Sequence, residues 1–124
     1  MAKFASDAVL DASLAKIATA TSQSVCSAQP ATRTEAVTTY MLATVTVMPG
    51  DGNGDFDIAN DTSGRKVTVA EQADTTITNS GDATHIAYTD GSDVLYVTTC
   101  TLQALTAAGT VTVPAHKFNI QDPT

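Results

Sequence analysis

The first periodic pattern along the chain is that of an amphipathic helix over about residues 6–18. Its apolar positions recur at intervals of three and four residues: Leu10, Leu14 and Ile17. Ser6 or Asp7 stands where an N-cap can accept a hydrogen bond from the first turn. Because the apolar side is a single stripe, we expect this helix to pack across a sheet.

From about residue 24 to residue 121 the pattern becomes one of short strands separated by turn residues. The strand-like runs are 24–27, 44–47, 66–69, 76–78, 83–89, 94–100, 110–113 and 117–120. Asp90-Gly91-Ser92-Asp93 lies between two of these runs and is typical of a β-hairpin turn. The stretch 33–48 is ambiguous, because Glu35-Ala36-Val37 can open a helical turn before the strand begins.

Short strands at intervals near ten residues predict an antiparallel β-sandwich or a jelly-roll-like double sheet. The N-terminal helix makes the class mainly β, or α+β by a strict count. The length of 124 residues favours one domain, 1–124. Aromatic residues make up only 5% and Trp is absent, so we expect thin sheet packing instead of a deep pocket walled by rings.

The charge and hydropathy of the chain limit the classes of partner that we expect it to bind. The net charge is −7, and the six basic residues are scattered along the chain, so no basic stripe is available to bind DNA or RNA. No run approaches ~20 apolar residues, and the N-terminus lacks the apolar core of a signal peptide. We therefore expect a chain made in a cytoplasm, with no membrane partner, whose Cys26 and Cys100 are reduced.

Catalytic motifs are missing from the sequence. The two histidines, His85 and His116, lie in no recognisable motif, and we interpret them as a sheet-face residue and an exposed turn residue. Walker, dinucleotide-binding, Cys-x-x-Cys and Gly-x-Ser-x-Gly patterns are also missing. The sequence predicts neither an enzyme nor a bound cofactor.

One Gly-rich loop carries oxygen ligands at alternate positions, as the start of a calcium loop does. These weak candidates for a Ca²⁺ site are Asp51, Asn53, Asp55 and Asp57. Phe56 stands where a calcium loop needs Gly, and Thr62 stands where it needs a bidentate Glu. We therefore expect no metal here, and a polar turn is the favoured interpretation.

Several blocks resemble a group of small structural proteins of tailed bacteriophages. The blocks are VCSAQP at 25–30, GRKVTV at 64–69, ATHIA at 83–87, LYVTTC at 95–100 and GTVTVPA at 109–115, with Ile120, Asp122 and Pro123 near the end. They follow one another in order over nearly the whole chain, and the loop 50–54 reads as an extension of the pattern. The resemblance implies a virion component and attaches no catalytic residues to it.

A capsid decoration (cement) protein that binds the lattice of the major capsid protein fits both the resemblance and the composition. The alternatives are a tail, neck or fibre-adaptor protein of the virion, and a soluble carbohydrate-binding β-sandwich. The runs 75–78 and 110–113 contain no Lys or Arg to protect a strand edge, so we expect a homo-oligomer, with a trimer as the favoured symmetry.

Overall fold

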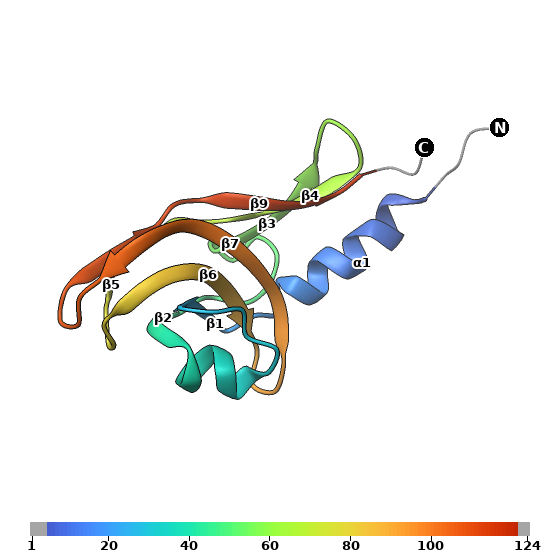
Figure 1. Cartoon of the computed structure of the whole chain (residues 1–124). Coiled ribbons are helices and arrows are strands. Elements are labelled where there is room, and N and C mark those ends of the chain that lie inside the picture. The colour runs from blue at the N-terminus through green and yellow to red at the C-terminus, as the bar shows by residue number, and fades with distance from the viewer. Residues whose placement is uncertain (1–4, 122–124) are drawn as a thin grey trace.

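Helix α1, Asp7–Ile17, forms where the periodicity predicts it (Figure 1). The computed structural model describes residues 5–121. The Ser6 side chain accepts a hydrogen bond from the backbone N–H of Val9 and so caps the first turn. The predicted stripe is buried, because Leu10, Leu14 and Ile17 all lie in contact with the rest of the chain.

Nine strands and one short π-helix follow in the described part of the chain. They are β1 (Ser22–Cys26), the π-helix η1 (Glu35–Thr39), β2 (Met41–Thr46), β3 (Phe56–Asn60), β4 (Arg65–Val69), β5 (Gln72–Thr76), β6 (Gly81–Thr89), β7 (Val94–Leu105), β8 (Thr110–Val113) and β9 (His116–Ile120). Between them the strands form three sheets, with orders β2-β1-β6-β7, β3-β4-β9 and β5-β8. Every named strand pairing is antiparallel, which confirms the predicted mainly β, sandwich-like class.

The long curved hairpin of β6 and β7 arches beside the strands of the second sheet, and α1 lies across one end (Figure 1). The predicted turn at Asp90 connects the two hairpin strands. The carboxylate of Asp90 accepts hydrogen bonds from the backbone N–H groups of Asp93 (2.7 Å) and Ser92 (2.8 Å). These bonds stabilise the ionised carboxylate and lower the pKa of Asp90.

The main core lies between the sheets and beneath α1. Its largest fully buried side chains include Tyr88, Phe56 and Leu14. A second, smaller cluster of Cys26, Ala36 and Ala87 lies on the other face of the four-stranded sheet, beneath η1. Side chains alternate between the two faces of a strand, so neighbouring residues of β1 and β6 serve different clusters.

Some predicted boundaries were wrong. The first strand begins at Ser22, before the predicted 24–121 region, and β2 covers Met41–Thr46 instead of 44–47. The strand predicted at 76–78 lies earlier, as β5, and Ile77 makes only an isolated bridge to Ala43. Strand β3 was not predicted, because its first residues follow the Gly-rich loop and its polar positions weaken the alternation.

The runs 75–78 and 110–113 were expected to be strand edges, the second ended by Pro114 and the first without protection, and the structure changes this expectation. The two runs face each other, because β5 pairs with β8 through Thr75↔Val111 and Thr76↔Thr110. Each of these strands therefore protects one edge of the other. Among the described strands, β7 pairs only with β6 and β8 only with β5.

Candidate functional site: the groove beside β7

The predicted cation loop uses its polar groups to hold its own shape. Asp55 accepts hydrogen bonds from the backbone N–H of Met48 (2.6 Å) and from the side-chain amide of Gln72 (3.0 Å). Asp51 accepts one from the backbone N–H of Ile58 (2.9 Å), and the Asn53 amide donates one to a backbone carbonyl (2.8 Å).

Asp57, the fourth candidate, lies exposed on β3. Within residues 5–121, no group of three or more His, Cys, Asp or Glu side chains is placed to hold a metal ion. The carboxylates that the sequence singles out are thus separate acceptors in a folded loop. The absence of a calcium site stays a prediction.

Two ion pairs fix the helix and a loop to the second sheet. Arg65 of β4 donates to both carboxylate oxygens of Asp11 on α1, at 2.7 and 3.1 Å, and these bonds raise the pKa of the guanidinium. Lys117 of β9 donates to Asp61 at 2.9 Å, which lowers the pKa of that carboxyl. Each ion pair connects two elements of the fold. The four charged side chains are therefore accounted for by structural pairing, and no ligand is needed to explain them.

The histidines differ in their roles. His85 lies in β6, as the sequence predicts, with its Nδ1 at 2.8 Å from the Thr84 hydroxyl. The prediction for His116 was wrong: it begins β9, is partly buried, and its Nε2 lies 3.1 Å from the hydroxyl of Tyr88. That hydroxyl is fully buried and also donates to the side-chain oxygen of Gln23 at 2.7 Å. His116 therefore joins β9 to the interior of the first sheet.

The two cysteines are free thiols that serve different clusters. Cys26 is fully buried in the cluster beneath η1, and Cys100 packs against the main core. Burial raises the pKa of the Cys26 thiol to about 11, with a smaller contribution from Cys100. Because the alternation of β1 directs Cys26 away from the main core, Cys26 and Cys100 lie on opposite faces of the sheet. The fold therefore does not place the two thiols for a disulfide bond.

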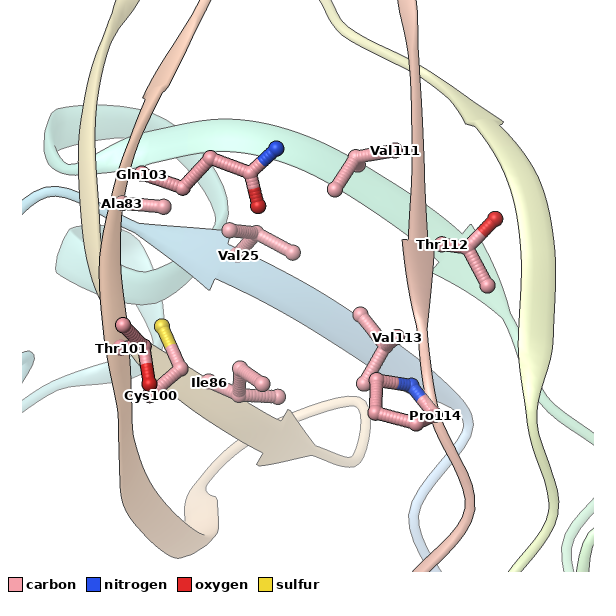
Figure 2. Close-up of a pocket in the computed structure, with 10 residues that line it drawn as sticks. All are labelled: Val25, Ala83, Ile86, Cys100, Thr101, Gln103, Val111, Thr112, Val113 and Pro114. Atoms are coloured by element: carbon pink, nitrogen blue, oxygen red, sulfur yellow. The ribbon is translucent and has the colours of Figure 1, made fainter.

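A concave feature lined mostly by uncharged residues lies between β7 and β8, and we call it the β7–β8 groove. It consists of two adjoining cavities of about 210 Å³ and about 370 Å³, which share part of their lining. The shared residues are Ile86, Cys100, Thr101, Val113 and Pro114. Figure 2 shows Cys100, Thr101 and Gln103 on one wall, β8 on the other, and Val25 and Ile86 between them.

The side chains that line the groove are mostly apolar or neutral. Between Asp93 and Lys117 the chain carries no Asp, Glu, Lys or Arg, and this stretch supplies β7, β8 and the turn between them. Lys117 lines only the end of the second cavity, where it is paired with Asp61. A surface of this kind can bind a polypeptide through backbone hydrogen bonds and apolar side chains, without charge.

Sequence reasoning missed this groove. The charge-free stretch is visible in the sequence and is a usable signal, whereas Val25 and Ile86 reach the groove only through the pairing of β1 with β6. No helix of the described residues is long and apolar enough to cross a membrane. No family model, curated protein or solved structure matches this chain.

Proposed function

We propose that this protein is a structural component of a tailed-bacteriophage virion, a capsid decoration (cement) protein that binds the lattice of the major capsid protein. It is made in the host cytoplasm and acts in the assembled particle, without catalysis and without a cofactor. The sequence blocks that resemble small phage structural proteins suggest the class. They fall on β1, β4, β6, β7 and β8, so the resemblance follows the elements that build the sandwich.

The observation that supports the proposal best is the β7–β8 groove on an acidic protein, because Lys117 is the single charged residue that lines it. The cores of protein interfaces are depleted in charged residues, and neutral strand edges are a common means of joining protein chains. A lattice protein repeats its contacts many times, so each contact can be modest. A small sandwich that combines this groove with a net charge of −7 suits that role.

A carbohydrate-binding sandwich has less support. Such a site needs aromatic rings exposed as platforms, and Tyr88 is fully buried. Tyr96 is partly buried and stacks on Tyr88, with ring centroids 5.8 Å apart. The tyrosines of β6 and β7 thus serve the core of the sandwich. A tail, neck or fibre-adaptor position shares every feature given above and is separated from decoration by the experiment below.

The test is quantitative mass spectrometry of purified particles, with the copy number expressed relative to the major capsid protein. Decoration predicts hundreds of copies, whereas a neck or fibre position predicts a handful. Absence of the chain from washed particles refutes a virion role altogether. Particles carrying His85→Ala should assemble with the same copy number, because His85 makes only a local contact with Thr84.

A further inference from the structure

We propose that two copies of this chain join through the free edges of β7, paired antiparallel about a two-fold axis. This inference deepens the proposed function, because it names the contact between copies of the decoration protein. It concerns the isolated chain as well as the particle. The contact between copies can therefore be tested on the purified chain, separately from the virion role.

The outer edge of β7 is exposed and uncharged over part of its length. Strand β7 is 12 residues long and, in the described part of the chain, pairs on one side only. Its residues 101–104 are all exposed, and Leu102 retains 62% of its accessible surface. A strand edge presents unpaired N–H and C=O groups, and natural proteins usually protect it with Lys, Pro or a bulge that turns the edge away. β7 contains neither Lys nor Pro.

The pairing of β7 with β6 shifts register twice, between Tyr88 and Thr89 and, beside the groove, between Ala83 and His85. The latter shift lies beside Thr101 and locally interrupts the pairing with β6. It leaves the strand continuous from Val94 to Leu105. The edge is thus long enough for several residues on either side of the shift to pair with a second strand.

The charge of the chain points to a second copy as the partner of this edge. Each copy carries a net charge of −7, so two copies repel each other over most of their surfaces. The stretch between Asp93 and Lys117 is free of acidic and basic residues, and it forms this edge. Asp82 lies opposite Ala104 but on β6, one strand behind the edge. Pairing of β7 with the β7 of a second copy therefore brings two uncharged surfaces together.

The shape of the groove suits the side chains of an added strand. A drug-sized ligand needs a pocket of roughly 300–1,000 Å³ that encloses it. The cavity between Val25 and Val111 has about 210 Å³, and the adjoining cavity of about 370 Å³ continues along β7, so the two together suit the row of side chains of an added strand. Antiparallel pairing of one strand with its own copy is self-complementary, since each partner offers the same patch. The side chains of the second β7 that face the groove cover it.

The pairing of the strands also explains why we propose a two-fold contact instead of the trimer expected from the sequence. That expectation rested on the runs 75–78 and 110–113 as free edges. The two runs pair with each other, whereas β7 is the longest of the described strands that lie at the end of a sheet. One edge that pairs with its own copy forms a closed dimer.

The experiment is sedimentation equilibrium of the full chain, compared with Thr101→Lys on the β7 edge. The matched control is Asn119→Lys, which adds the same charge to exposed Asn119 on β9, the edge of the other sheet. We expect the wild type and Asn119→Lys to be dimers at about 100 μM, where a micromolar contact is largely saturated. Thr101→Lys should raise the dissociation constant by about tenfold or more. Circular dichroism checks that each variant is folded, and Thr99→Lys replaces Thr101→Lys if the latter does not fold.

Salt gives a second readout. Raising NaCl from about 50 to about 500 mM should strengthen the wild-type dimer, because screening weakens the repulsion between two acidic copies. A monomer at about 100 μM overturns the inference, as does an oligomer that Thr101→Lys leaves intact or that Asn119→Lys disrupts. If sedimentation shows a monomer while mass spectrometry finds hundreds of copies on the particle, the decoration role stands and the β7 contact is refuted. The opposite pair of results removes the virion role and keeps the contact.

Discussion

Replacement of Tyr88 by Phe should destabilise the protein through one hydroxyl group. Tyr88 is fully buried at the centre of the main core, where its ring packs against Phe56, Tyr96 and His116. Its hydroxyl donates to the side-chain oxygen of Gln23 and lies 3.1 Å from Nε2 of His116. Phe keeps the ring and leaves almost no cavity, so the substitution removes the polar contacts alone.

The size of the destabilisation follows from the acceptor that loses its hydrogen bond when the hydroxyl is removed. Gln23 is 1% exposed, so its side-chain oxygen loses a partner that water cannot easily replace. A buried acceptor left unpaired costs about 1–3 kcal/mol in the free energy of unfolding. For a domain of this size, that corresponds to a fall in Tm of about 4–12 °C.

The assay is urea unfolding followed by circular dichroism, with Tyr96→Phe as the matched control. Tyr96 is only partly buried and stacks on Tyr88, so its replacement should change the free energy of unfolding by less than about 0.5 kcal/mol. His116→Ala removes one of the two polar neighbours, and a double-mutant cycle with Tyr88→Phe should give a coupling energy of about 0.5 kcal/mol or more. Equal stability of Tyr88→Phe and Tyr96→Phe would refute the argument.

Three further predictions concern the thiol, the ion pair and the loop. Because the pKa of Cys26 is raised from 9.0 to about 11 in the folded state, the neutral thiol stabilises the fold below pH 9. About 2–3 kcal/mol of the free energy of unfolding should be lost as pH rises through 11, and Cys26→Ala should remove that component from a pH series of urea melts. Asp11→Asn breaks the pair with Arg65 and should lower Tm slightly, with a loss that shrinks in high salt in calorimetry; an unchanged Tm at low salt contradicts this. Millimolar Ca²⁺ should move the Tm of the wild type by no more than about a degree, whereas a site at 100 Kd adds about 2.7 kcal/mol. A larger rise that Asp55→Ala abolishes would establish a calcium site.

The parts of the fold that could be predicted are those fixed by neighbouring residues. Helix α1 follows from the spacing of its apolar stripe, and the β6–β7 hairpin follows from Asp90 and the turn residues after it. Strand β5 was misplaced because its position is set by pairing with β8, more than thirty residues further on. Such pairing depends on the tertiary packing of both partners, which local propensity does not record.

The candidate site shows the same division. The polar loop from Asp51 to Asp57 is visible in the sequence, yet the structure engages most of its polar side chains in hydrogen bonds that shape the loop. His116 follows a proline and looks like a turn residue, and only the packing of β9 against the first sheet brings it to Tyr88. The groove depends on residues from β1, β6, β7 and β8 together, so the charge-free stretch marks only the part that β7 and β8 supply.

The groove has a physical cause in the distribution of large side chains along β7. Near one end of the strand, Tyr96 stacks on Tyr88 and contacts Phe118 of β9 with ring centroids 4.8 Å apart, so aromatic rings fill the space between the sheets. Further along, the lining consists of smaller side chains such as Ala83 and Thr101, and these leave the space between β7 and β8 unfilled. Among the described strands, β7 pairs only with β6. Its backbone edge is consequently available to another strand, and the absence of charge on it favours a strand from a second copy of this acidic chain.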